Sequence, residues 1–444
     1  MDRTLGWIGI FRLGLVQTAI GSIVVLVTAT LNRVMVVELS LAATIPGLLV
    51  GLHYAVQLLR PLWGHASDVG GRRTRWIVGG MFLLGLGAAG ASVAVAVMAH
   101  NVVLGLVLAF LDFVLIGFGV GAAGTSLLAL LASSVAPVRR PAAATIVWLM
   151  MIAGMAVTAT VAGGLLDPFS HARLIAVVGA TALSALALTA VALWGMEDCI
   201  SSQNVGASAR APVSFRESLA EAWADPKARL FTIFVFVSML AFSAQDLILE
   251  PFAGLVFGWT PGETTSLAGI QHGGVFLGML TTGIGGSLLS KWYPGALRVI
   301  TVGGCVASAV VLLGLSLAAA HPEIWPLSIN VFALGFANGI FAVAAIGSMM
   351  ALAGAAGPER TGTRMGLWGA AQAIAFGLGG LVGTIAVDLT RWISGQVAAS
   401  YGLVFTIEAL AFLVAAAIAA RVAIVRREAP ARPAATNAFA TPAE

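Results

Sequence analysis

Long apolar stretches recur along the whole chain and are separated by short polar intervals. A helix needs about 20 predominantly apolar residues to cross the hydrocarbon core of a membrane, and twelve stretches reach that length. The stretches cover approximately residues 13–36, 42–63, 76–98, 102–132, 142–165, 173–194, 230–257, 264–289, 297–319, 326–354, 365–387 and 401–425. This pattern predicts an all-α polytopic membrane protein with 12 transmembrane helices.

The composition excludes an ordinary soluble protein. Hydrophobic residues make up 59% of the chain and charged residues only 9%, with 53 glycines, which is far from the balance of soluble domains. The first apolar stretch starts at Leu13 and continues well past Val27. It is too long for a cleaved secretory signal, so we expect the first helix to stay. The two cysteines, Cys199 and Cys305, show no disulfide or metal-ligand spacing.

Arginine and lysine are unevenly distributed between the two sides of the predicted membrane. If the N-terminus is cytoplasmic, 20 of the 23 Arg and Lys residues fall on the cytoplasmic side. Arg33, Arg173 and Arg391 fall on the other side. Because cytoplasmic loops carry the excess of positive charge, we expect both termini in the cytoplasm. The net charge of +4 follows from this topology and indicates no nucleic-acid partner.

The longest polar interval, about 195–229, divides the predicted helices six and six, as in transporters built from two parallel halves. Within it, Ser214 and Glu217 form a capping-box pattern, which predicts an amphipathic helix on the membrane surface. A weak internal repeat supports the division, because His53 aligns with His272 at an offset of 219. The predicted domains are an N-terminal half at 1–195, a cytoplasmic linker at 196–229, a C-terminal half at 230–427 and a disordered cytoplasmic tail at 428–444.

One loop, between the second and third apolar stretches, combines glycines, an acid and arginines. Its residues Gly64, Asp68, Gly71, Arg72 and Arg73 follow the pattern Gly-x-x-x-Asp-x-x-Gly-Arg-Arg, which resembles the loop between helices 2 and 3 of major facilitator transporters. The glycines allow a close turn, and the acid can meet a helix N-terminus or an arginine. The resemblance implies a major facilitator fold with two six-helix halves. The alternative is a plain cytoplasmic anchor with a charge bias.

Two apolar stretches contain polar and charged groups, which are costly inside a membrane and often functional. These groups are Asn32, Arg33 and Glu38 in the first stretch and Gln245, Asp246 and Glu250 in the seventh. Asp246 and Glu250 lie four residues apart and share a helical face, so they need a cation or a proton. Four roles are open: a gate in which Arg33 pairs with Asp246 or Glu250, static contact between helices, proton coupling, or direct substrate contact.

Two histidines lie inside predicted membrane helices. His53 shares one helical face with Gln57 and Arg60, and His272 follows Gln271. A neutral imidazole at such a position can hydrogen-bond a neighbouring helix, carry a proton, or donate an axial nitrogen to the magnesium of a chlorin. The sequence leaves these alternatives open for both histidines.

The sequence contains no catalytic constellation. It has no glycine-rich phosphate loop followed by Lys and Ser or Thr, so we expect no nucleotide. The other four histidines, His65, His100, His171 and His321, lie near the predicted membrane surfaces without metal-ligand spacing. We therefore expect a protein that is not an enzyme and has no metal site of its own.

Five segments are similar to the PucC and LhaA family, the bacteriochlorophyll-delivery branch of the major facilitator superfamily. They are Phe11–Gln17, Thr30–Leu39, Gly51–Gln57, Ser67–Thr74 and Ala244–Phe252. The short loop Asp-Val-Gly-Gly-Arg-Arg looks more like the branch encoded with bacteriochlorophyll synthesis genes. The resemblance extends over nearly all twelve predicted helices.

This resemblance implies a role in supplying bacteriochlorophyll, or a late precursor, during assembly of light-harvesting complexes. It implies light-harvesting antenna polypeptides, bacteriochlorophyll synthase and membrane lipids as partners, in the bacterial inner (intracytoplasmic) membrane. It makes His53, Gln57, Gln271 and His272 candidates for pigment binding, with either histidine as an axial ligand to magnesium. Two alternatives remain: a proton-coupled secondary transporter of a small solute, and a non-transporting assembly scaffold for antenna polypeptides.

Overall fold

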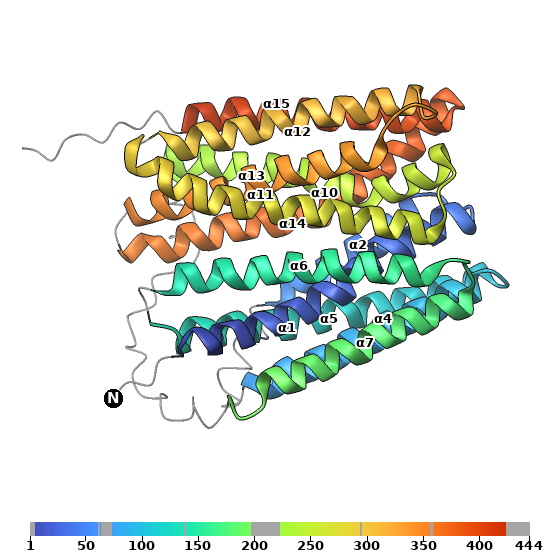
Figure 1. The fold of residues 1–444 in the computed structure, drawn as a ribbon, viewed down its shortest axis with the longest axis horizontal. Helices are drawn as coiled ribbons and strands as arrows, with labels where there is room; N and C mark the ends of the chain where they lie inside the picture. Colours follow the sequence, from blue (N-terminus) through green and yellow to red (C-terminus); the bar gives the residue numbers. More distant parts are fainter. Residues whose placement is uncertain are drawn as a thin grey trace, which may run out of the picture.

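The computed structural model describes residues 5–60, 63, 73–136, 139–196, 223–293, 295–355 and 358–422, and these regions are almost entirely helical. In chain order (Figure 1) the elements are α1 (Trp7–Val25), extended by the π-helical segments η1 (Leu26–Leu31) and η2 (Val34–Glu38), α2 (Thr44–Val56), extended by the 3-10 turn η3 (Gln57–Leu59), α4 (Arg73–Met98), α5 (Val102–Ser134), α6 (Arg140–Leu166), α7 (His171–Leu193), α10 (Pro226–Phe257), α11 (Pro261–Trp292), α12 (Ala296–Ala320), α13 (Leu327–Ala355), α14 (Pro358–Ser394) and α15 (Val397–Val422). The twelve predicted helices are thereby confirmed.

Within the described residues, ten helices are long and apolar enough to cross a membrane. The apolar helix Thr44–Leu59 is shorter. The remaining helix, α11, has 32 residues but carries polar side chains along its length, among them Gln271 and His272. The two helices that fall short are those that contain His53 and His272.

Helix boundaries follow local sequence signals. Thr260 and Glu263 form a capping box at the start of α11, in which the Thr260 hydroxyl accepts from Glu263 N–H at 3.1 Å and the Glu263 carboxylate accepts from Thr260 N–H at 2.8 Å. These bonds satisfy amide groups that have no partner within the helix. The preceding helix, α10, ends just before Gly258. This residue has φ +70, a left-handed conformation that glycine adopts without strain.

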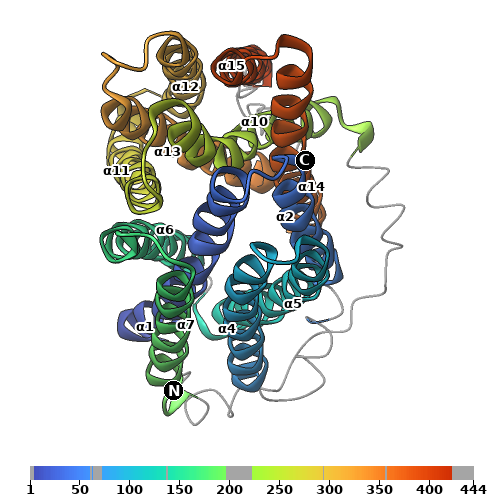
Figure 2. The same cartoon turned by 90° about the vertical axis from the view of Figure 1, so that its right-hand side faces the viewer.

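The helices form two groups, with α1, α2 and α4–α7 in one half and α10–α15 in the other (Figure 2). Across the boundary α6 packs along α11, and α2 packs along α14. The first turn of α1 and the last turn of α15 lie at the same end of the molecule, on the left in Figure 1. We call this the terminal end and the other the closed end.

Small residues let the helices that carry the candidate site approach closely. A methyl group on Gly335 of α13 would lie 2.0 Å from the carbonyl oxygen of Gln271, and one on Gly274 of α11 would lie 2.4 Å from that of Phe332. Membrane helices often associate through such contacts. Gly274 lies two residues after His272. It therefore allows close helix packing and fixes the position of α11 against α13.

Several predictions concern residues outside the described part of the chain. They include the amphipathic linker helix, because residues 197–222 are not described, and the tail beyond residue 422. Helix α10 starts at Pro226, inside the interval predicted as linker. The domain boundaries and the cytoplasmic location of both termini stay predictions.

Candidate functional site

A cavity of about 410 Å³ lies between the two halves. Its polar lining comes from both halves. The N-terminal half contributes His53, Gln57 and Arg60, from α2 and the turn that extends it, and the C-terminal half contributes Asp246, Glu250, Gln271 and His272, from α10 and α11. The rest of the wall is largely apolar and includes several methionines and aromatic rings. An apolar pocket of this size with a few convergent polar groups is typical of a small-molecule site.

The polar groups of the N-terminal half form a chain along one face of α2 and η3. Arg60 donates to the Gln57 side-chain oxygen, the Gln57 amide nitrogen lies 2.8 Å from His53 Nε2, and His53 Nδ1 lies 3.2 Å from the Val50 carbonyl oxygen. The predicted grouping of His53, Gln57 and Arg60 therefore exists as a continuous hydrogen-bonded chain. His53 and Gln57 are buried, whereas Arg60 is exposed.

The polar groups of the C-terminal half are less completely paired. Gln271 Nε2 donates to Asp246 Oδ1 at 3.4 Å, and His272 Nδ1 lies 2.8 Å from the Ala268 carbonyl oxygen. Glu250 is buried, and within the described part of the chain neither of its carboxylate oxygens has a hydrogen-bond partner. The sequence predicted Asp246, Glu250, Gln271 and His272 as candidates. It did not predict how they pair, because the pairing depends on the contact between α10 and α11.

Aromatic side chains from both halves meet at the cavity wall. The Tyr54 ring lies 4.3 Å from the His53 ring and 6.1 Å from the Phe376 ring, between centroids. Phe376 in turn lies 5.8 Å from Phe242. Such rings offer apolar faces to a flat ligand. The sequence did not distinguish them from ordinary core residues, because an aromatic residue in a membrane helix has no distinctive spacing.

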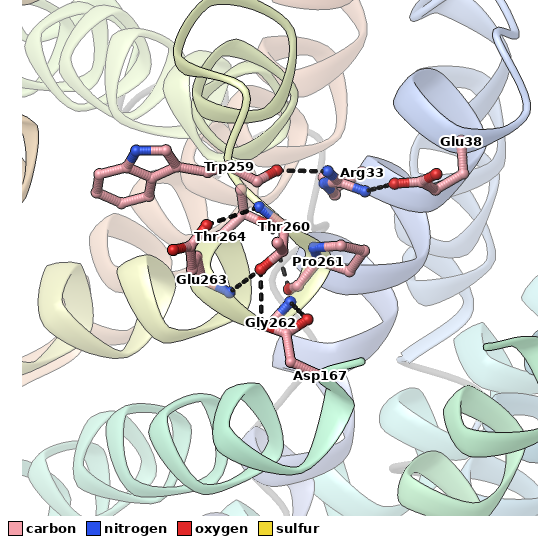
Figure 3. A network of polar contacts seen from close by, with 9 residues as sticks. All are labelled: Arg33, Glu38, Asp167, Trp259, Thr260, Pro261, Gly262, Glu263 and Thr264. Atoms are coloured by element: carbon pink, nitrogen blue, oxygen red, sulfur yellow. Dashed lines mark hydrogen bonds and ion pairs between the residues drawn. The ribbon is translucent and has the colours of Figure 1, made fainter. Parts of the chain in front are cut away.

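Polar contacts between the halves hold the closed end together (Figure 3). Asp167, just after α6, accepts hydrogen bonds from Thr260 Oγ1 at 2.6 Å and from Gly262 N–H at 3.2 Å. Arg33 donates to the Trp259 carbonyl oxygen at 2.7 Å. A carboxylate is stabilised at a helix N-terminus, so Asp167 anchors the start of α11 to the N-terminal half.

A second anchor lies between α14 and α2. Asp388 accepts from the backbone N–H groups of Ala43 and Thr44, at 3.1 and 2.7 Å, and from the Thr44 hydroxyl at 2.7 Å. Asp167 and Asp388 were not singled out from the sequence. Each is a lone acid near a helix end, and only the partner helix shows its role.

Among the described residues, Arg33 does not form the gate pair with Asp246 or Glu250 that was one of the four open roles. Arg33 forms its ion pair with Glu38 of its own helix. The guanidinium does pass close to α10, since a methyl group on Gly254 would lie 3.2 Å from Arg33 Nε. It therefore lies one helical turn beyond Glu250, without pairing with it.

The π-helical geometry explains this difference. Arg33 and Glu38 are five residues apart, and in an α-helix of 3.6 residues per turn they would point to different faces. The described helix is π-helical at Leu26–Leu31 and Val34–Glu38, where the repeat lengthens towards five residues. The two side chains can then meet. Helical periodicity in the sequence did not predict the π-helical turns.

The remaining candidates are Asn32, Gln245 and the residues of the loop motif. Asn32 Nδ2 donates to the Leu247 carbonyl oxygen at 2.6 Å and so joins α1 to α10. Gln245 is fully buried, and neither of its side-chain polar atoms has a hydrogen-bond partner among the residues that the structure describes. In the loop motif, Gly64, Asp68, Gly71 and Arg72 lie outside the described residues. Arg73 is described and donates to the Ala129 carbonyl oxygen at 2.9 Å.

Two seams join the halves, one between α6 and α11 and one between α2 and α14. Along α6 and α11, close contact at the closed end continues into an apolar cluster of Ile152, Val275 and Met279. Along α2 and α14, the contact reaches Gly377, where a methyl group would lie 3.2 Å from Tyr54 Cβ. Further along the chain, Leu58 and Leu59 of η3 are 60% and 40% exposed. In the chain these two leucines lie between Gln57 and Arg60, which line the cavity.

Comparison with known proteins assigns the family. Residues 30–428 match the family described as PUCC protein. The chain is 54% identical over 423 residues to "Bacteriochlorophyll synthase 44.5 kDa chain" of Rhodobacter capsulatus, covering 95% of this chain and 97% of that one. It is 31% identical to "Protein PucC" of the same organism, covering 92% and 91% of the two chains.

Solved structures of transporters share the fold. A bacterial homolog of the human lysosomal transporter Spinster, in an inward-facing and occupied conformation, aligns with a TM-score of 0.68 at 14% identity, covering 93% of this chain and 96% of that one. A bacterial homologue of the human drug peptide transporters PepT1 and PepT2 aligns with a TM-score of 0.67 at 15% identity, covering 94% and 97%. These likenesses establish the major facilitator fold.

Proposed function

This chain belongs to the PucC family and has a major facilitator fold, and from that premise we propose that it binds bacteriochlorophyll, or a late precursor, and delivers it within the membrane for assembly of light-harvesting complexes. The observation that carries the proposal is the central cavity, whose wall is mainly apolar and includes polar groups from both halves. We propose light-harvesting antenna polypeptides and bacteriochlorophyll synthase as the partners that take or supply the pigment.

The cavity suits the ring of a chlorin better than a hydrophilic solute. Apolar side chains and the rings of Tyr54, Phe242 and Phe376 provide flat contacts, while the imidazole rings of His53 and His272 add polar groups to the wall. At about 410 Å³ the cavity lies near the lower end of ligand sites, roughly 300–1,000 Å³. We propose that it receives the macrocycle and that the isoprenoid tail stays in the membrane.

The seam between α2 and α14 offers a path for that tail. A pigment with an apolar tail lives in the bilayer, so its carrier needs a lateral opening rather than a fully sealed aqueous cavity. Leu58 and Leu59 are exposed at the end of this seam, and Gln372 and Ala373 of α14 line the cavity beside it. We propose that the tail leaves between these helices.

A related protein carries the word "synthase" in its name, but we propose that this chain handles pigment without making it. Its cavity groups hold hydrogen bonds and apolar surface rather than a nucleophile and an activating base in contact. We further propose that it works in the bacterial inner (intracytoplasmic) membrane, with membrane lipids around it and both termini in the cytoplasm.

Gly124 offers a direct test of the cavity. It lines the cavity, and a methyl group added there meets no atom of the described residues within 4 Å, so Gly124→Leu should fill the cavity without disturbing the helices. Gly179→Leu is the matched control, since Gly179 of α7 has equal space and does not line the cavity. The measurement is the absorption spectrum of each protein purified in mild detergent from a pigment-making host.

We expect bacteriochlorophyll to accompany the wild type and Gly179→Leu, and to fall at least about fivefold in Gly124→Leu. Wild-type protein free of pigment, from a host with pigment to spare, would overturn delivery by direct binding. Capture of antenna polypeptides in pigment-free membranes would then favour the scaffold.

The second candidate is a proton-coupled transporter of a small solute. It is favoured by Asp246 and Glu250, two carboxyl groups that line the cavity in a fold shared with transporters. Solute uptake into proteoliposomes driven by a pH gradient, lost in Asp246→Asn and Glu250→Gln, would support it. Pigment binding that persists in both variants, without any such flux, would contradict it.

A further inference from the structure

The two cavity histidines differ in what their ring nitrogens contact. On His53 both nitrogens are engaged. Arg60 donates to the Gln57 oxygen, which turns the Gln57 amide nitrogen towards His53 Nε2 at 2.8 Å. An amide nitrogen only donates, so His53 Nε2 must accept. The proton is then on Nδ1, 3.2 Å from the Val50 carbonyl oxygen. The lone pair of His53 is therefore already used.

His272 has the opposite property. Its Nδ1 lies 2.8 Å from the Ala268 carbonyl oxygen, and a carbonyl oxygen only accepts. Nδ1 therefore carries the proton, and the lone pair is on Nε2. Among the described residues Nε2 has no hydrogen-bond partner, and the side chain lines the cavity. His272 thus presents a free imidazole lone pair to the cavity.

The surroundings hold this imidazole in place. Contact between Nδ1–H and a backbone carbonyl fixes the tautomer and ring orientation and raises the basicity of the other nitrogen, as it does for histidines that bind metals. Close packing of Gly335 on Gln271 fixes the backbone beside it. Little reorganisation is then needed when Nε2 binds a ligand.

We infer that His272 Nε2, and not His53, is the protein atom that ligates the magnesium of a bound chlorin ring. This inference rests on the proposed function, and it assigns separate tasks to two residues that the sequence presented as equivalent. His53, locked by Gln57 and Arg60, forms a polar wall. The Phe242 and Phe376 rings, 5.8 Å apart, supply apolar contact on the cavity wall.

The test compares bacteriochlorophyll with its magnesium-free form, bacteriopheophytin, on the full-length protein in detergent. Binding is measured by fluorescence titration for the wild type, His272→Ala and His53→Ala, and the magnesium coordination number by resonance Raman spectroscopy. The wild type should prefer the magnesium pigment by at least about tenfold, which equals 1.4 kcal/mol. His272→Ala should lose this preference and regain it when imidazole is added.

His53→Ala is the matched comparison, because it removes an imidazole from the same cavity. Whatever its overall affinity, it should keep the preference for magnesium, and imidazole should not change it. Since each protein is compared with itself on two pigments, altered folding does not mimic the result.

Each failure points to a different cause. If His272→Ala keeps the preference for magnesium while Gly124→Leu abolishes pigment binding, the ligand assignment is wrong and the cavity remains the binding site. If His53→Ala loses the preference and imidazole restores it, the assignment belongs to the other histidine. If the wild type binds neither pigment, the proposed function itself fails.

Discussion

Arg33 lies between two acidic side chains, and the structure pairs it with only one of them. Its partner is Glu38, whose side chain is 35% exposed, whereas the Arg33 side chain is 2% exposed. Glu250 is buried, and both of its carboxylate oxygens lack a hydrogen-bond partner in the described regions. A buried charge that loses its partner is strongly destabilising, so the two acids should respond differently to the same chemical change.

We expect Glu38→Gln to lower the free energy of unfolding by about 1–3 kcal/mol, because it leaves the buried Arg33 without an anion. We expect Glu250→Gln to have no cost or to stabilise by up to about 1 kcal/mol, because it removes an unpaired carboxyl group. Thermal unfolding in detergent measures both. The reverse order would mean that Arg33 pairs with Glu250 in the working protein.

Helices α2 and α14 meet through glycines that differ in their available space. A methyl group on Gly47 would lie 2.1 Å from Thr384 Oγ1, 3.1 Å from its Cβ and 3.3 Å from its Cγ2, so rotation of the threonine does not relieve the clash. On Gly51 the nearest atoms would lie at 3.7 and 4.0 Å. One turn of α2 is therefore packed tightly and the next has room.

Gly47→Ala should destabilise the protein by about 1–3 kcal/mol, the usual cost of overpacking. Gly51→Ala should be neutral or stabilise by up to about 1 kcal/mol, because alanine favours the helix. Unfolding temperatures of the two variants, measured side by side, test this. Equal effects would show that α2 and α14 are not held at the described distance.

At the scale of the whole molecule, every described hydrogen bond between the halves lies towards the closed end. They join residues 30–33 to α10, α11 and the turn between them, the start of α2 to α14, and Asp167 to the start of α11. The exposed Arg60 marks the cavity wall towards the terminal end. The described conformation is therefore shut at one end by polar contacts between the halves.

Asp388→Asn should loosen the closed end, because it removes a charge that accepts three hydrogen bonds from α2. Hydrogen bonds to charged groups contribute about 1.5–3 kcal/mol each. With Cys199 and Cys305 replaced by alanine, a cysteine at the fully buried Val34 position reports opening through its maleimide labelling rate. We expect at least a fivefold increase.

Glu323→Gln is the control for that experiment, since Glu323 is an exposed acid in the loop after α12. Its labelling rate should equal that of the parent. An unchanged rate in Asp388→Asn would show that Asp388 does not hold the halves together.

Much of the architecture could be predicted from the chain because a membrane imposes one strong local rule. A helix must supply about 20 apolar residues to cross a membrane, so the twelve helices appear directly in the pattern. In the described part of the chain, ten of them are long and apolar enough to satisfy this rule. Polar residues inside those helices are costly. This made His53, Gln57, Asp246, Glu250, Gln271 and His272 visible, and all six line one cavity.

The pairing of those residues was decided by the tertiary structure. Arg33 meets Glu38 because the helix is π-helical there. Asp388 accepts a hydrogen bond from Thr44 at the start of α2, although the two residues are 344 positions apart in the chain. His53 and His272 look alike in the sequence, and only their neighbours give one a free nitrogen. Sequence patterns reflect the local cost of burying each group, whereas hydrogen bonds depend on which atoms of distant helices lie within reach.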